Sequence, residues 1–159
     1  MKKVLIVEDE ILARLGLRQL VDWRKLELEL LPDATDGEEA LEMIRNSRPD
    51  IILLDLNIPR VSGLEILGFL KKEEMKTRVI VVSCQEEFDV VKKAMKLGAY
   101  DYLRKLNLSS DELESILEKC LGETEERNKV HMQGIREIRY EEIMRDSRDI
   151  FAGTCNYQT

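Results

Sequence analysis

Histidine and paired cysteine are nearly absent from this sequence, and their absence excludes several classes of site. His131 is the only histidine in 159 residues, which excludes most zinc chemistry and every histidine-dependent nucleophile pair not built on that residue. The three cysteines, Cys84, Cys120 and Cys155, are odd in number and lack C-x-x-C spacing, so neither a disulfide framework nor a zinc site is expected. We assign Cys120 and His131 no functional role.

The sequence also lacks a surplus of basic residues and any long apolar stretch. Its formal net charge is -7, so no excess of positive charge is available to neutralise nucleic-acid phosphates, and we expect no direct nucleic-acid binding. The apolar run at residues 4–7 stops at Glu8, far too early for the apolar part of a signal peptide. No run approaches the ~18 apolar residues of a membrane span. We therefore expect a cytoplasmic protein without membrane contact.

What the sequence does contain is a regular alternation of short apolar runs with longer amphipathic segments. Each run is followed by a helical pattern, and capping patterns begin three of the helices while Gly98 ends another. Five strand–helix units in succession predict an α/β fold with a parallel sheet covered on both faces. The strands are predicted at residues 4–7, 28–31, 51–54, 79–82 and 100–103, and the capping patterns at Asp36, Ser62 and Ser109.

Residues 122–159 differ in character from the rest of the chain. They are rich in glutamate and arginine and sparse in apolar residues, and one charged helix is predicted at residues 123–148. The irregular apolar spacing favours a solvated helix, and a dimeric coiled coil is the alternative. We predict one domain at residues 1–121 and a charged helical tail at residues 122–159, with no helix-turn-helix pattern.

Charged and polar residues stand at the ends of the predicted strands. Glu8 and Asp9 follow the first strand, Asp55 the third, Ser83 the fourth and Lys105 the fifth. Because the carboxyl ends of parallel strands meet at one edge of a sheet, we expect three carboxylates, a hydroxyl and an ammonium around one point.

Crowded carboxylates resist joint ionisation unless a cation lies among them, and Mg²⁺ suits a site of few carboxylates and several waters. The backbone carbonyl of Asn57 is a further candidate ligand. A carboxylate oxygen beside Mg²⁺ can attack phosphorus, and the Lys105 ammonium would offset the charge of the phosphoryl group. Taken singly, Asp55 can be a helix cap, a metal ligand or a nucleophile, and Asp9 can be the cap of the helix near Ile11.

Four segments together resemble the receiver domain of bacterial two-component response regulators over about residues 1–121: "VLIVEDE", "DATDGEEAL", "PDIILLDLNIPRVSGLE" and "VIVVSCQEEFDVVKKAMKLGAYDYLRK". The stretch "LARLGLRQLVDW" further resembles the receivers of AraC-type (YesN-like) transcriptional regulators. The resemblance implies a flavodoxin-like, doubly wound, five-stranded parallel sheet with five helices.

The resemblance also implies roles for the residues at the strand ends. Asp55 would be the phosphoacceptor, and Glu8 and Asp9 would form with it the acidic Mg²⁺ pocket, to which Asn57 adds its backbone carbonyl.

Three further residues would respond to the phosphoryl group. Ser83 and Lys105 would sense it, and Tyr102 would be the aromatic switch, although an aromatic residue in a short strand is more commonly part of the core. The sequence departs from the family at Leu106, where proline is usual, and at Cys84, where a smaller residue is common and where a larger side chain would restrict access to the acyl phosphate.

The function implied is a phosphoacceptor switch: a sensor histidine kinase donates a phosphoryl group, and the interaction surface changes. No enzymatic activity is expected beyond self-catalysed phosphotransfer and dephosphorylation. One rival is a stand-alone receiver that acts as an interaction module. Another is a haloacid-dehalogenase-like phosphohydrolase, which generally needs a second aspartate where Asn57 stands. Because no DNA-binding output domain follows, we expect the receiver part of a transcriptional regulator, which contacts DNA only through that missing domain.

We also expect phosphorylation to promote a homodimer. The predicted contact is the face that carries Phe88, Val91 and Tyr102, continued by the tail helix at residues 123–148. Glutamate and arginine in the tail would supply exposed cross-helix pairs of ~0.2–1 kcal/mol each. A monomer is the alternative.

Overall fold

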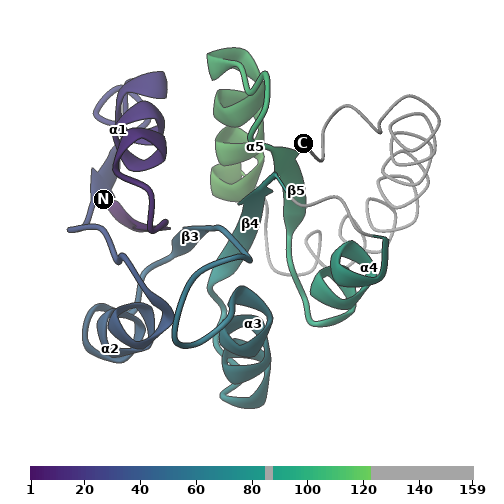
Figure 1. Ribbon diagram of the computed structural model, residues 1–159. Helices are drawn as coiled ribbons and strands as arrows, with labels where there is room; N and C mark the ends of the chain where they lie inside the picture. The colour runs from purple at the N-terminus through teal and green to yellow at the C-terminus, as the bar shows by residue number, and fades with distance from the viewer. Residues whose placement is uncertain (85–87, 123–159) are drawn as a thin grey trace, which may run out of the picture.

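The computed structural model describes residues 1–84 and 88–122, which form a parallel sheet between two layers of helices (Figure 1). The strands are β1 (Lys2–Val7), β2 (Leu28–Leu30), β3 (Ile51–Leu54), β4 (Arg78–Ser83) and β5 (Asp101–Arg104). The helices are α1 (Ile11–Leu20), α2 (Gly37–Ser47), α3 (Gly63–Lys72), α4 (Phe88–Lys96) and α5 (Ser110–Gly122). The tail helix predicted at residues 123–148 lies outside the described residues.

The strands run parallel in the order β2-β1-β3-β4-β5. The chain moves outward from β1 to β2 and then crosses to β3 on the other side, so the winding direction changes between β1 and β3. The register pairs Val7 with Leu54 and Leu54 with Val81, so the strands end together at one edge, called here the carboxyl rim. This arrangement confirms the predicted doubly wound, five-stranded parallel sheet, and its switch point is where ligands bind in such folds.

Both faces of the sheet are buried, which is why its strands are almost continuously apolar. Val4 and Ile6 of β1 belong to the cluster that α1 and α5 cover, whereas Leu5 and Val7 belong to the cluster under α2, α3 and α4. Figure 1 shows these two helical layers on opposite sides of the sheet. The rim residues are therefore attached to a sheet whose position is fixed from both faces.

Local capping follows the sequence patterns. Gly98 ends α4 with φ of +102°, a backbone conformation that glycine adopts without steric cost. The three predicted caps are confirmed by hydrogen bonds from the backbone N–H groups of Glu39 to Asp36 (2.8 Å), Glu65 to Ser62 (3.2 Å) and Glu112 to Ser109 (3.1 Å).

Several strand boundaries differ from the prediction by one or two residues, among them β1, which begins at Lys2. Strand β5 begins one residue later than expected, at Asp101, and β4 extends to include Ser83. The N-cap residue of α1 is Glu10, so the alternative in which Asp9 caps this helix is wrong. No helix among residues 1–84 and 88–122 has the length and apolar character needed to cross a membrane.

We predict that Gly37→Ala destabilises the protein, because the added Cβ would lie 1.9 Å from the backbone oxygen of Val61. A clash with backbone should lower the free energy of unfolding by about 1–3 kcal/mol, as overpacking does in cores. The matched control is Gly68→Ala in α3, where nothing lies within 4 Å of the added Cβ. That change should stabilise the helix by about 0.5–1 kcal/mol. Urea unfolding of both variants tests the pair, and equal effects would contradict it.

Candidate functional site

Two carboxylates are buried side by side at the carboxyl rim. Glu8 follows β1 and Asp55 follows β3, and their side chains are neighbours because β1 and β3 pair directly. The backbone N–H of Asp55 donates to the carbonyl of Val7 at 3.0 Å, and that of Glu8 donates to Ala34 at 3.0 Å. Glu8 is 1% exposed and Asp55 is 5% exposed. The sheet therefore holds both acidic groups largely away from solvent.

A third carboxylate and an ammonium complete this cluster. Side-chain oxygens of Glu8, Asp9 and Asp55 all lie within 4.8 Å of one another. The Nζ of Lys105, which follows β5, donates to Glu8 Oε1 at 2.7 Å and to Asp55 Oδ2 at 2.9 Å. The structure thus brings together the predicted Glu8, Asp9, Asp55 and Lys105.

The protonation of the cluster follows from burial and mutual contact. Burial, together with the hydrogen bond to Asp55, raises the pKa of Glu8 from 4.5 to about 7. Burial acts to raise the pKa of Asp55 too, but hydrogen bonds from Glu8, Lys105 and the Asn57 N–H outweigh it and hold this pKa below its usual value. Burial acts to lower the pKa of Lys105, and its two carboxylate partners raise it. Below about pH 7 this pair accordingly favours an ionised Asp55 next to a protonated Glu8.

The loop after β3 orients the Asp55 carboxylate. The backbone N–H of Asn57 donates to Asp55 Oδ1 at 2.9 Å, while the Asn57 side chain is exposed. Gly63 closes this loop through a hydrogen bond from its N–H to the carbonyl of Leu56 at 3.1 Å. A Cβ at Gly63 would lie 2.6 Å from the Leu56 Cα, so a glycine is needed at this close approach.

Ser83 and Tyr102 are buried, as are two of the three carboxylates. Ser83 is fully buried at the end of β4, and its carbonyl accepts a hydrogen bond from the backbone N–H of Lys105 at 3.2 Å. Tyr102 is 2% exposed and packs in the cluster under α2, α3 and α4. Val91 is 1% exposed in the same cluster. Two of the three residues of the predicted dimer face, Val91 and Tyr102, are thus buried in this conformation, and the face stays a prediction for the phosphorylated state.

One residue next to the cluster was missed in the sequence. The Nη1 of Arg14 donates to the carbonyls of Glu8 and Asp9, in each case at 3.0 Å. Arg14 lies six residues after Glu8 and five after Asp9, and neither spacing corresponds to a regular helical contact, so no sequence pattern indicated these hydrogen bonds.

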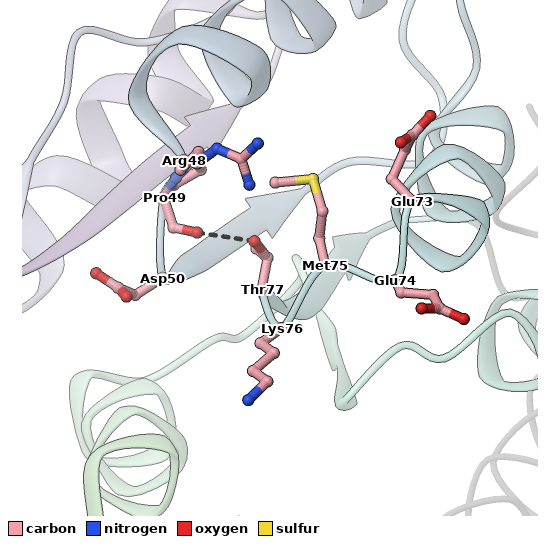
Figure 2. A pocket seen from close by; sticks show the side chains of 8 residues that line it. All are labelled: Arg48, Pro49, Asp50, Glu73, Glu74, Met75, Lys76 and Thr77. Carbon is pink, nitrogen blue, oxygen red and sulfur yellow. Dashed lines mark hydrogen bonds between the residues drawn. The ribbon is translucent and has the colours of Figure 1, made fainter.

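A separate pocket of about 300 Å³ lies at the opposite edge of the sheet, where β3 and β4 begin (Figure 2). Charged side chains of both signs surround it, among them Arg48, Glu73 and Lys76. Thr77 Oγ1 donates to the carbonyl of Pro49 across it at 2.8 Å. None of the predicted site residues lines this pocket, so the candidate site is the carboxyl rim.

The donor set at the rim fits a hard divalent cation. Three carboxylates from the ends of β1 and β3 supply oxygen ligands, which Mg²⁺ prefers, and leave room in its coordination sphere for water. A cation there would also remove the obstacle to joint ionisation of Glu8 and Asp55.

Residues 4–118 match the family of response regulator receiver domains, and the chain belongs to that family. It is 34% identical to a response regulatory protein of Staphylococcus epidermidis, over 74% of this chain and 46% of that protein. It is 30% identical to the transcriptional regulatory protein YesN of Bacillus subtilis, over 89% of this chain and 38% of YesN. The chain thus spans less than half the length of these two relatives.

Solved structures agree with this membership. The REC domain of AraT, a response regulator from Geobacillus stearothermophilus, matches with a TM-score of 0.69 and 29% sequence identity. The match covers 84% of this chain and 98% of that domain. The resemblance to receiver domains, and the flavodoxin-like fold that it implied, are confirmed.

We predict that the Mg²⁺-free protein loses stability as pH rises from about 5 to 8. The folded state holds a proton on Glu8 up to a pKa of about 7, whereas the unfolded chain releases it near 4.5, so deprotonation favours unfolding between these values. The expected loss is roughly 1–3 kcal/mol. The titration of Asp55, whose pKa is lowered, changes the stability only below this pH range, and that of Lys105 changes it only above the range.

Urea unfolding in EDTA across this pH range measures the effect. Glu8→Gln keeps an acceptor for Lys105 but cannot titrate, so its stability should be nearly flat over the same range. A slope in Glu8→Gln equal to that of the parent would assign the titration to another group.

Proposed function

We propose that this chain is the phosphoacceptor switch of a two-component pathway, with Asp55 as the acceptor and a sensor histidine kinase as the donor. The observation that supports it best is the state of Asp55: an ionised carboxylate at the switch point of the sheet, held by the Lys105 ammonium and the Asn57 N–H. Such a carboxylate is a fixed oxygen nucleophile beside oxygen ligands for Mg²⁺.

The chemistry proposed is an in-line transfer. An Asp55 oxygen forms a bond to phosphorus as the bond between phosphorus and the donor imidazole nitrogen breaks, which leaves an aspartyl phosphate and a histidine. Glu8, Asp9, Asp55 and the Asn57 carbonyl would hold Mg²⁺, which would supply charge stabilisation for the phosphoryl oxygens. The Lys105 Nζ, already 2.9 Å from Asp55, supplies a further positive charge and a hydrogen bond on the same side.

In this proposal the output depends on Ser83 and Tyr102. Both are buried in this conformation, so recognition of a phosphoryl group by the Ser83 hydroxyl requires a local rearrangement. The hydrogen bond from the Lys105 N–H to the Ser83 carbonyl links the ends of β4 and β5 and gives such a rearrangement a path to Tyr102. A phosphoryl group needs to favour the rearranged state by only a few kcal/mol to change its population substantially.

Neither rival function is supported as well. A haloacid-dehalogenase-like phosphohydrolase needs an acid–base carboxylate two residues after the nucleophile, and position 57 carries an exposed amide instead. A pure interaction module would not need three clustered carboxylates with a shared ammonium. We therefore propose no enzymatic role beyond self-catalysed phosphotransfer and dephosphorylation.

The role of the longer protein is proposed from its relatives. Because the chain spans less than half of YesN, a transcriptional regulatory protein, we propose a receiver at residues 1–121 and a linker tail at residues 122–159 of a transcriptional regulator. DNA would be contacted only through an output domain. Dimerisation on phosphorylation remains part of this proposal, and use of the face of Phe88, Val91 and Tyr102 would require the rearrangement to expose Val91 and Tyr102.

The donor kinase has an apolar surface available beside Asp55. Five large hydrophobic side chains of the described residues are exposed, and four of them border the rim: Ile11, Leu12 and Leu15 in the first turns of α1, and Leu106 after Lys105. Helices α1 and α5 lie on the same face of the sheet (Figure 1). Exposed apolar residues gathered around a site mark an interaction surface, so we propose that the kinase docks there.

We predict that Asp55 becomes phosphorylated by acetyl phosphate in the presence of Mg²⁺. Intact-mass spectrometry should show one added phosphoryl group. EDTA should prevent the labelling, because the metal is needed to offset the negative charge of the phosphoryl oxygens. Asp55→Asn, which keeps the shape of the side chain but cannot form the acyl phosphate, should remain unlabelled. Asp22→Asn, at an exposed carboxylate outside the site, should label like the parent. Labelling of Asp55→Asn at the parental rate would refute the assignment.

We predict that Leu12→Ser slows transfer from an autophosphorylated sensor histidine kinase about tenfold, the effect expected when ~1.4 kcal/mol of apolar contact is lost. The side chain is 83% exposed, so the change should not destabilise the chain. Labelling by acetyl phosphate, which needs no docking surface, should be unchanged. Glu42→Ser on the exposed side of α2 is the control. Equal transfer to all three proteins would exclude α1 from the docking surface.

A further inference from the structure

The Arg14 guanidinium reaches back from α1 to the end of β1. Its Nη1 donates to the carbonyl oxygens of Glu8 and Asp9, both at 3.0 Å. The side chain is 17% exposed although it is long and charged, so it lies against the protein along its length. Both carbonyls belong to residues that carry carboxylates of the rim cluster.

A second contact fixes the guanidinium from its other side. The Nε of Arg14 lies 3.9 Å from Asp33 Oδ2, in the loop between β2 and α2. Asp33 is itself held by Arg18, whose Nη1 is 2.8 Å from its Oδ1 and also donates to the carbonyl of Leu31 at 3.3 Å. The guanidinium therefore bridges two loops at the rim and has a defined orientation.

We propose that Arg14 is a positioning residue for the Mg²⁺ site. By holding the two carbonyls it fixes the peptide groups after Glu8 and Asp9, and so directs both carboxylates toward Asp55 before the cation binds. The guanidinium also occupies the carbonyl oxygens, which leaves side-chain oxygens as the ligands from this loop. Orienting groups of this kind strengthen metal binding without touching the metal. The inference rests on the proposed function, since it assumes that the cluster binds Mg²⁺.

The proposal makes a prediction of opposite sign to that of simple electrostatics. A guanidinium close to a cation site repels the cation, so by charge alone the removal of Arg14 should strengthen Mg²⁺ binding. If Arg14 positions the carboxylates, its removal should weaken binding. The direction of the change in Mg²⁺ affinity therefore distinguishes the two roles.

The test is isothermal titration of Mg²⁺ into the parent, Arg14→Met and Arg18→Met. Arg14→Met keeps the length of the side chain but removes every hydrogen-bond donor. We expect its Mg²⁺ dissociation constant to rise about tenfold, which is the smallest change usual when a group that orients metal ligands is lost. Arg18→Met removes the same charge one turn along α1. It also releases Asp33, but the Arg14 bonds to the Glu8 and Asp9 carbonyls remain, so its constant should rise no more than about twofold, or fall.

Two further measurements separate positioning from loss of structure. The Mg²⁺ concentration for half-maximal labelling by acetyl phosphate should rise in Arg14→Met, while the rate at saturating Mg²⁺ should stay near that of the parent. Arg14→Lys, which retains several donors on one nitrogen, should recover part of the affinity. Arg14→Gln replaces Arg14→Met if thermal melts show that the latter does not fold.

The possible results decide between distinct conclusions. Unchanged or tighter Mg²⁺ binding in Arg14→Met would overturn the proposal, and so would an equal loss in Arg18→Met. An additional variant, Asp9→Ala, tests the proposed metal site itself. If Asp9→Ala weakens binding and Arg14→Met does not, the positioning role alone fails. If the parent binds no Mg²⁺, or Asp9→Ala binds as the parent does, the proposed metal site fails and the role of Arg14 with it.

Discussion

The burial of two neighbouring carboxylates beside one ammonium is the constraint on which this site depends. Glu8 and Asp55 are almost inaccessible to solvent, and their joint ionisation there is unfavourable even with Lys105 bonded to both. The protein keeps the cost low by leaving a proton on Glu8, as its raised pKa indicates. A divalent cation would remove the need for that proton. The acidic cluster is therefore suited, on electrostatic grounds, to a divalent cation.

The parallel sheet is what makes such an arrangement possible at all. Residues after β1, β3 and β5 converge because parallel strands end at one edge, and the apolar residues on both faces hold those ends in place. The loops then add donors that a strand cannot offer, such as the Asn57 N–H on Asp55. Rigid strands fix where the carboxylates are, and the loops determine which way they point. Arg14 belongs to the second group, since it acts on a loop from a neighbouring helix.

The sequence predicted the parts of this protein that depend on local pattern. Strand positions, three helix caps and the residues after each strand could be read from apolar runs and short polar motifs, because each depends on neighbours in the chain. The contact of Arg14 depends on how α1 is oriented on the sheet, and no periodicity encodes it. The burial of Tyr102 agrees with the ordinary expectation for an aromatic residue in a short strand, and its role as a switch could not be read from the pattern.

The buried position of Tyr102 constrains how a signal can leave the site. A residue that is 2% exposed cannot report to a partner unless it moves, and any movement must disturb the cluster under α2, α3 and α4. Such packing changes between discrete arrangements more readily than it deforms gradually. Lys105 connects the end of β4 to the carboxylates, because its ammonium contacts Asp55 while its backbone N–H bonds to Ser83. A phosphoryl group on Asp55, as proposed, would compete for that ammonium, and the same residue would then carry the change into the β4–β5 edge.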